Sequence, residues 1–402
     1  MCITVGFVPH RQGMRILSVI GTRPEAIKMA PVLDRLARTP GIESVVCTTG
    51  QHASMLQQVL DLFGLHVDHD LQVMVQGQTL NGLCARVFER LDPVLERVCP
   101  DRVLVHGDTT TAMAASLAAF HRRIPVGHVE AGLRTGTLSQ PWPEEMNRRV
   151  VDVVSDQLFA PTEGARQNLL TENLGGRIHV TGNTVIDALH SMVQRLETDA
   201  VLRARLDANL PALDPSRRMV LVTGHRRENF GPAMADICHA ICALACRGDI
   251  ELVYPVHLNP QVREPVLRIL QGQAHVHLIE PQDYAGFVRL MQLASVVLTD
   301  SGGVQEEAPA LGKPVLVMRE VTERPEAVQA GTVRLVGASK ERIEKEVSLL
   351  LDDAAQYQCM AHSVNPYGDG HASERIVAIL CGQDMEPFRP ETTLPGHFTT
   401  RS

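Results

Sequence analysis

Acidic side chains follow two apolar segments in the N-terminal half of the chain, where they could transfer protons. Asp108 follows the segment 103–106, Glu130 follows 125–129, and Glu144 comes shortly afterwards. Carboxyl groups near one substrate can serve as general acid and general base when their surroundings set their pKa values apart. Simpler explanations exist: Asp108 could cap a helix, and the two glutamates could be solvated surface charges.

A glycine-rich turn in the C-terminal half could bind a phosphate. The apolar segment 294–298 leads into Ser301, Gly302 and a second glycine, and a predicted helix follows. The first N–H groups and the positive end of a helix attract anions, and glycine lets the backbone approach closely. Ser301 could cap this helix or donate to a phosphate, and Glu307 could accept from ribose hydroxyls. A plain tight turn explains the same residues, because one such turn is a weak signal.

Short apolar segments alternate with helical ones along nearly the whole chain. This pattern predicts an α/β protein made of two Rossmann-like domains, each with a parallel sheet and helices on both faces. Ligands of such sheets bind beyond the carboxyl ends of the strands, so we expect the active site in the interdomain cleft. The predicted strands are 15–20, 44–48, 103–106, 125–129, 157–160, 219–223, 250–255, 276–279, 296–298, 315–318 and 332–335.

The chain of 402 residues is too long for one typical core. We expect an N-terminal extension over 1–13 and a first domain over 14–185 that also takes a helix at 371–381. The second domain, which binds the nucleotide, covers 186–370, and residues 382–402 form a polar, flexible tail.

Composition narrows the class of function. The net charge is −8, which argues against nucleic acid as a partner. No apolar run reaches the roughly 18–20 residues that span a bilayer, so no membrane association is expected. Nine cysteines without framework spacing suit the reducing cytoplasm, and the absence of a CxxC pair argues against a metal site. The dinucleotide fingerprint, the P-loop, the GxSxG elbow and the HExxH motif are all absent.

A series of motifs over about residues 14–380 occurs in the same order as in a known protein family. It is similar to the non-hydrolysing UDP-N-acetylglucosamine 2-epimerases, which have the two-domain GT-B fold. The matching motifs are Gly21-Thr-Arg-Pro-Glu-Ala-Ile-Lys28, Thr49-Gly-Gln-His52, Gly107-Asp-Thr-Thr-Thr111, His128-Val-Glu-Ala-Gly-Leu-Arg134, Pro143-Glu-Glu-Met-Asn147, Thr181-Gly-Asn-Thr184, Thr223-Gly-His-Arg-Arg-Glu-Asn229, Pro255-Val-His-Leu-Asn-Pro260, Asp300-Ser-Gly-Gly-Val-Gln-Glu-Glu307 and Thr322-Glu-Arg-Pro-Glu326.

The resemblance implies roles for particular residues. The catalytic group would be Asp108, Glu130, Glu144 and His225. The substrate-binding group would be Arg23, Lys28, Gln282, Phe287, Ser301, Gly302, Glu307 and Arg324, with Gln282 and Phe287 near the uracil. Many bacterial members bind a second UDP-N-acetylglucosamine as an activator, and Gln51, His52 and His257 fit that site. This chain departs from the pattern at 75–78, where it lacks an arginine that some members use there.

The resemblance also implies a reaction: UDP leaves C1, C2 loses its proton to give a bound glycal, and re-addition gives UDP-N-acetylmannosamine. This scheme needs no cofactor and no metal. A homodimer that serves surface polysaccharide synthesis is expected. The alternatives are a hydrolysing 2-epimerase that releases UDP and N-acetylmannosamine, an epimerase of a modified UDP-sugar, and a GT-B glycosyltransferase. A non-catalytic nucleotide sensor is disfavoured because every catalytic position is filled.

Overall fold

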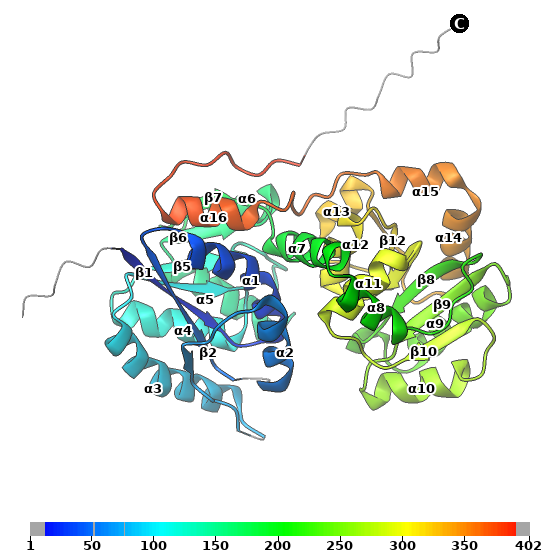
Figure 1. The fold of residues 1–402 in the computed structure, drawn as a ribbon, viewed down its shortest axis with the longest axis horizontal. Coiled ribbons are helices and arrows are strands. Elements are labelled where there is room, and N and C mark those ends of the chain that lie inside the picture. The colour runs from blue at the N-terminus through cyan, green and yellow to red at the C-terminus, as the bar shows by residue number, and fades with distance from the viewer. Residues whose placement is uncertain (1–12, 51–52, 76, 391–402) are drawn as a thin grey trace, which may run out of the picture. The chain divides into compact units, whose positions relative to one another are not determined.

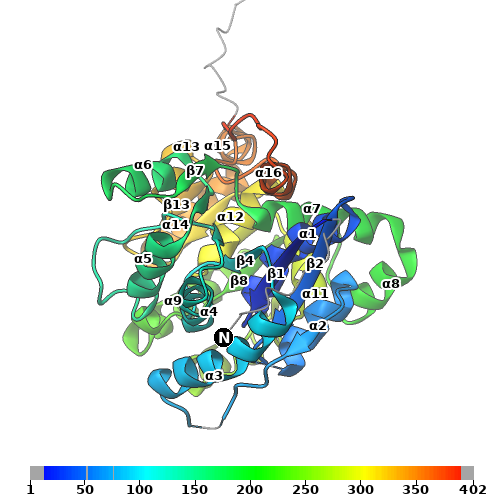
Figure 2. The ribbon, with the colours of Figure 1, turned by 90° about the vertical axis from the view of Figure 1, so that its left-hand side faces the viewer.

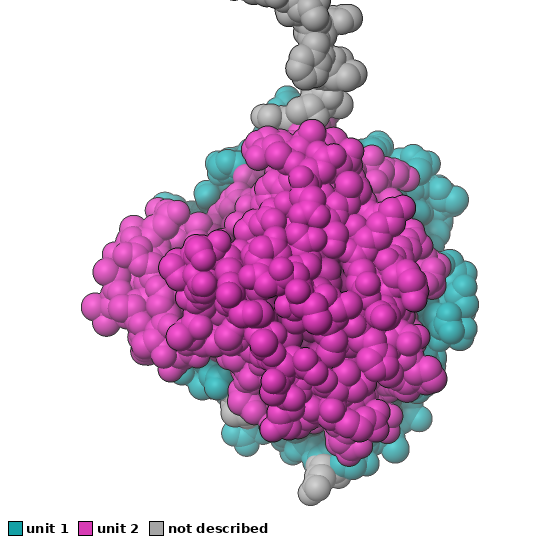
Figure 3. Space-filling model, turned by 90° about the vertical axis from the view of Figure 1, so that its right-hand side faces the viewer, with its two compact units in different colours: residues 1–184, 371–387 teal, residues 185–370, 388–402 magenta. Residues whose placement is uncertain are grey.

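The computed structural model describes residues 13–50, 53–75 and 77–390. Residues 1–12 of the predicted extension and 391–402 of the predicted tail lie outside this range. Contacts divide the described chain into two compact units, unit 1 within residues 1–184 and 371–387 and unit 2 within 185–370 and 388–402 (Figure 3). Within the described residues, every helix is too short or too polar to cross a bilayer.

Unit 1 is built on a seven-stranded parallel sheet in the order β3-β2-β1-β4-β5-β6-β7. Its strands are β1 Met14–Ile20, β2 Ile42–Thr48, β3 His69–Asp70, β4 Arg102–His106, β5 Val126–Val129, β6 Gln157–Ala160 and β7 Arg177–Val180. Its helices are α1 Arg23–Arg38, α2 Ala53–Phe63, α3 Leu80–Val98, α4 Thr110–His121, α5 Glu144–Val154, α6 Glu163–Thr171 and α16 Ala372–Leu380.

Helices cover unit 1 in two groups (Figures 1 and 2). Helices α3, α4 and α5 pack side by side, and α16 returns from the far end of the chain to pack on α1. The alanines of α4 allow its close approach to α3 and α5, because a small side chain keeps the helix axes near one another. The core of this unit is aliphatic and includes fully buried residues of β1 and β4, such as Leu17 and Leu104.

Unit 2 has a six-stranded parallel sheet in the order β10-β9-β8-β11-β12-β13. Its strands are β8 Arg218–Thr223, β9 Ile250–Pro255, β10 Val276–Ile279, β11 Val296–Thr299, β12 Val315–Val317 and β13 Val333–Leu335. The helices are α7 Thr184–Thr198, α8 Ala200–Ala208, the short 3₁₀ turn η1 Arg227–Asn229, α9 Pro232–Ala245, α10 Pro260–Leu270, α11 Tyr284–Leu293, α12 Gly302–Ala310, α13 Pro325–Ala330, α14 Lys340–Asp352 and α15 Ala354–Ala361. Helix α7 begins at the last residue of unit 1.

Each sheet contains one point where the strand order reverses. In unit 1 the chain moves outward from β1 to β2 and later resumes on the other side of β1 with β4. In unit 2 the same reversal lies between β8 and β11. The helices that follow the two central strands leave on opposite faces, so the carboxyl ends there are open to a ligand.

The α/β fold with two parallel sheets is confirmed, and the predicted strands all occur with boundary shifts of a few residues. Two strands were not predicted from the sequence. Strand β3 has only two residues, and the edge strand β7 has the sequence Arg-Ile-His-Val, which lacks a continuous apolar run.

Close packing around Gly127 of β5 yields a test of the unit 1 core. A Cβ at this position would lie 2.5 Å from Cδ2 of Leu104 and 3.4 Å from Phe159. We expect Gly127→Ala to lower the free energy of unfolding by about 1–3 kcal/mol, because an overpacked core must shift. The measurement is urea unfolding followed by circular dichroism.

The matched control is Gly175→Ala, where a new Cβ meets no heavy atom within 4 Å. It should change the unfolding free energy by no more than about 0.5 kcal/mol. Equal stability of the two variants would contradict this account of the β4–β5 packing.

Candidate active site

Asp108 stands directly beyond the carboxyl end of β4, next to the reversal point of unit 1. The guanidinium of Arg148 from α5 contacts its carboxylate, and Asn147 of the same helix donates to its backbone carbonyl over 2.9 Å. Burial raises the pKa of Asp108, and the nearby charge of Glu130 acts in the same direction, while Arg148 opposes both. The raised pKa suits a group that must both take and return a proton near neutral pH.

Glu130 occupies the position after β5 with a backbone φ of 69°, in the left-handed region. This conformation is uncommon for glutamate and is often found at functional positions. Its Oε1 contacts the ammonium of Lys28 and accepts from Asn183 Nδ2 over 2.8 Å. Lys28, predicted to bind substrate, is therefore an ion-pair partner of Glu130 in this structure.

His106, the last residue of β4, was not predicted as a site residue. Its Nε2 lies 3.5 Å from Oε2 of Glu130. Burial lowers the pKa of His106 to about 3, so its ring is neutral at physiological pH. The sequence signal was available, since His106 ends a predicted strand directly before the Gly107 motif.

Glu144 begins α5, and its Oε2 atom is buried without a hydrogen-bond partner among the described residues. The adjacent Glu145 differs, because its carboxylate is fully buried and contacts Arg148, Arg149 and the amide of Thr135. The two neighbouring glutamates therefore differ: ion pairs engage the carboxylate of Glu145, whereas one oxygen of Glu144 has no hydrogen bond to a described residue.

Arg23 is the first residue of α1, which begins beyond β1 at the reversal point. Glu25, two residues further along the same motif, is a buried residue. Glu25 is 3% exposed and accepts from the backbone amides of Gly21 and Thr22 and from the hydroxyl of Thr109. Burial raises the pKa of Glu25. Glu25 thus fixes the turn that carries Arg23.

The corresponding reversal point of unit 2 is organised by Asp300, which sequence reasoning quoted in a motif without giving it a role. Its carboxylate is fully buried after β11. It accepts from the backbone amides of His225 and Arg226, each at 2.9 Å, and from Asn229 Nδ2 at 3.1 Å. One carboxylate therefore fixes the whole loop that follows β8, because buried donors must be satisfied.

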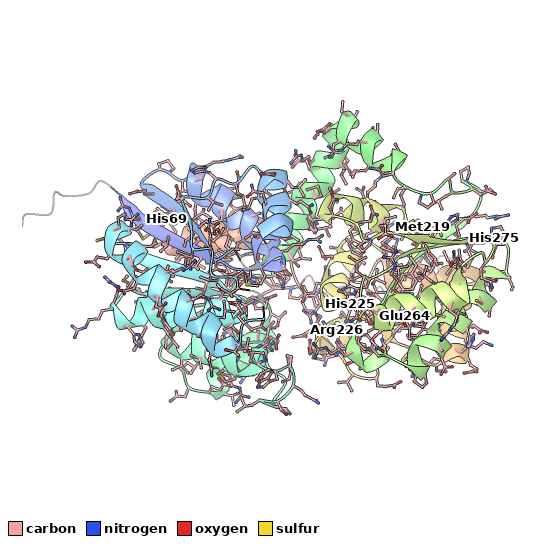
Figure 4. The ribbon with its side chains drawn as sticks, turned by 90° about the horizontal axis from the view of Figure 1, so that it is seen from below. His69, Met219, His225, Arg226, Glu264 and His275 are labelled. Atoms are coloured by element: carbon pink, nitrogen blue, oxygen red, sulfur yellow. The ribbon has the colours of Figure 1, made fainter. Side chains whose placement is uncertain are left out.

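His225 lies in that loop, with Nδ1 3.3 Å from Oδ1 of Asp300. Burial lowers the pKa of His225, and the neighbouring cation of Arg226 adds to this effect, whereas Asp300 opposes it. Figure 4 shows His225 and Arg226 together at one end of unit 2 and His275 at the opposite end. The ring of His257 stacks on His225 with centroids 5.6 Å apart.

Ser301 precedes α12, but its hydroxyl makes no capping bond, so its predicted capping role is not seen. The guanidinium of Arg324 lies close to Gly302, the first residue of α12. A Cβ on Gly302 would be only 2.7 Å from it. Its Nε donates to Glu306 over 2.6 Å. Close approach of a cation to this helix start therefore requires glycine at 302.

The remaining predicted residues of unit 2 lie on or near α11 and α12. Glu307 is buried and accepts from the hydroxyl of Tyr284 over 3.1 Å. Gln282 donates to the carbonyl of Glu280 over 2.7 Å, and Phe287 is half-buried on α11. Of the predicted activator residues, His257 stacks on His225, and Gln51 and His52 lie outside the described residues.

The loop fixed by Asp300 supports a stability prediction. In Asp300→Asn, a single amide oxygen replaces a carboxylate that serves two amides and a side-chain amide. We expect the unfolding free energy of unit 2 to fall by about 1–3 kcal/mol, because a buried donor loses its acceptor. The exposed Asp249→Asn in the same unit is the control, and an equal effect of both in urea unfolding would contradict the role given to Asp300.

Comparison with known proteins agrees with these features. A family model described as UDP-N-acetylglucosamine 2-epimerase matches residues 34–381. The UDP-N-acetylglucosamine 2-epimerase of Escherichia coli K12 is 58% identical over 369 residues, which cover 91% of this chain and 98% of the relative.

Two solved structures are similar to this chain over most of its length. The Neisseria meningitidis enzyme, a UDP-GlcNAc 2-epimerase bound to UDP-GlcNAc, has a TM-score of 0.87 and 49% identity, and the match covers 92% of this chain and 100% of that one. The Methanocaldococcus jannaschii UDP-GlcNAc 2-epimerase in complex with UDP-GlcNAc and UDP has a TM-score of 0.77 and 33% identity over 92% and 100%. The chain therefore belongs to the UDP-N-acetylglucosamine 2-epimerase family.

Proposed function

We propose that this protein interconverts UDP-N-acetylglucosamine and UDP-N-acetylmannosamine without hydrolysis. The C1–O bond to UDP breaks first, and the bonding electrons leave with the diphosphate. The positive charge at C1 makes the C2 proton acidic enough for a carboxylate to remove, which forms a C1=C2 glycal. A proton is then delivered to the opposite face of C2 while a diphosphate oxygen re-forms the bond to C1. Atoms and charges balance without any outside reagent.

The observation that carries this proposal is the set of acids beyond β4, β5 and the start of α5. Asp108 has a raised pKa, and Glu144 has a buried carboxylate oxygen that no described residue satisfies. Glu130 is held between Lys28, Asn183 and His106. Two faces of one carbon need two proton-transfer groups, and this arrangement supplies acids in different environments.

Unit 2 is proposed to hold the diphosphate. The start of α12 offers backbone N–H groups, and Arg324 lies against Gly302. His225 is neutral before the ligand arrives, with Nδ1 directed at Asp300. An anion beside its other nitrogen would favour protonation of the ring. The ring could then bind the leaving UDP more strongly as negative charge develops on it. Such preorganised donors are commonly worth several kcal/mol in the transition state.

Substitution of Asp108 tests the proton-transfer half of the proposal. We expect Asp108→Asn to abolish the exchange of the C2 hydrogen with solvent deuterium, because an amide cannot take up the proton. The affinity for UDP, measured by calorimetry, should change by less than about threefold, because UDP is proposed to bind to other residues. Deuterium at C2 is followed by proton NMR.

Asp34→Asn is the matched control, since Asp34 is an exposed acid of unit 1 that pairs with Arg38 on α1. It should exchange the C2 hydrogen at the wild-type rate. Undiminished exchange in Asp108→Asn would remove this residue from the mechanism.

A further inference from the structure

A buried ion network lies beneath the acids of unit 1. His128, in the middle of β5, is fully buried, with Nδ1 2.6 Å from Oδ1 of Asp152 and Nε2 2.8 Å from the carbonyl oxygen of Gly107. Asp152 is also fully buried and lies 2.8 Å from the guanidinium of Arg134. Two parallel hydrogen bonds of 2.7 Å hold Arg134 to Glu172.

The partners of His128 determine where its protons are. A backbone carbonyl can only accept, so Nε2 must carry a proton. The other ring nitrogen, Nδ1, lies 2.6 Å from the carboxylate of Asp152, whose second oxygen is held by Arg134. The ring is therefore fixed at both nitrogens, and Nε2–H is directed at the carbonyl of Gly107.

The carbonyl that His128 holds belongs to the peptide unit that leads into Asp108. Gly107 has a φ of +65°, and its amide donates to the carbonyl of Val129 over 2.9 Å. Val129 in turn directly precedes Glu130. The bond from His128 to Gly107 therefore ties together the two strand ends that carry Asp108 and Glu130.

Helix α5 connects this network to the third acid. Glu144, Asn147, Arg148 and Asp152 recur at spacings of three and four residues, which places them on one side of the helix. Asn147 and Arg148 contact Asp108, and Asp152 contacts His128. The same helix side thus holds Asp108 at two points, anchors β5 through His128, and carries Glu144.

We propose that His128, oriented by Asp152, is a positioning residue that sets the placement of Asp108 and Glu130 for proton transfer at C2. This inference rests on the proposed function and deepens it. The ring touches no substrate in this role. It acts by directing the Gly107 carbonyl, and thereby the acids on either side.

Substitution of His128 removes the donor to the Gly107 carbonyl. Phenylalanine keeps a flat ring in β5 but has no ring N–H, so the buried carbonyl loses its partner. Glutamine at the same position ends in an amide NH2, which can restore a donor to that carbonyl.

We expect His128→Phe to lower kcat by roughly 10²-fold, because small displacements of catalytic groups cost this much. KM and the affinity for UDP should stay within about threefold, because the diphosphate is proposed to bind to other residues. His128→Gln should recover about tenfold of the lost kcat, because it returns an N–H donor to the carbonyl.

A loss caused by poorer packing alone would not be recovered by glutamine, because glutamine, like phenylalanine, changes the shape of the buried side chain.

Asp156→Asn is the control, because Asp156 is an exposed acid of the same unit that pairs with Arg102. It should keep wild-type kcat. Unchanged kcat in His128→Phe, no recovery in His128→Gln, a rise in KM at unchanged kcat, or an equal loss in Asp156→Asn would overturn the inference. Failure of the wild-type protein to exchange the C2 hydrogen would instead overturn the proposed function.

A measurement on the wild-type protein covers the case in which His128→Phe does not fold. Nitrogen-15 NMR of labelled histidines should show a ring whose Nε2 carries a proton, and this signal should be absent from His128→Gln. A ring at position 128 with an unprotonated Nε2 would contradict the inference.

Discussion

Parallel strands bring all their carboxyl ends to one edge of a sheet, and the reversal of strand order opens that edge to a ligand. Both units of this protein obey this constraint. At β1 and β4 it places Arg23 and Asp108, and at β8 and β11 it places His225 and Ser301. These side chains therefore lie where the strand order reverses, and each needs only a short loop to reach the carboxyl edge of its sheet.

The buried carboxylates of the two units have different kinds of partner. Unit 1 gathers carboxylates and holds them with Lys28 and Arg148, so burial and neighbouring charge can set their pKa values apart. In unit 2 one buried carboxylate, that of Asp300, accepts from the backbone amides of His225 and Arg226 and so fixes the loop that carries them. Carboxyl groups can transfer protons, and N–H donors can bind an anion.

The sequence was enough to predict the α/β fold, because apolar strand segments and intervening helices have distinct periods. It also indicated the strand-end residues and, through ordered motifs, the family. It could not show what each buried acid contacts. In the sequence, Glu25 and Asp300 stand out only as members of motifs, whereas in the structure Glu25 accepts from three donors and Asp300 organises the loop of His225.

Such roles depend on contacts between residues far apart in the chain. Asp152 lies 24 positions from His128, and no local pattern links the two. The same holds for Lys28 and Glu130, which are separated by 102 positions. Spacing along a helix could have indicated that Glu144, Asn147, Arg148 and Asp152 share a side, but not which strand ends that side would meet.

The central claim is that the sugar's C1–O bond to UDP opens before C2 loses its hydrogen, and that both fragments stay bound until they rejoin. Oxygen-18 placed in the bridge between C1 and the diphosphate tests it directly. We predict that the label spreads to the non-bridging oxygens of the β-phosphate during epimerisation in deuterated water, together with deuterium at C2, while free UDP does not accumulate in step with turnover. Epimerisation with the label fixed in the bridge, or stoichiometric release of UDP, would contradict the account.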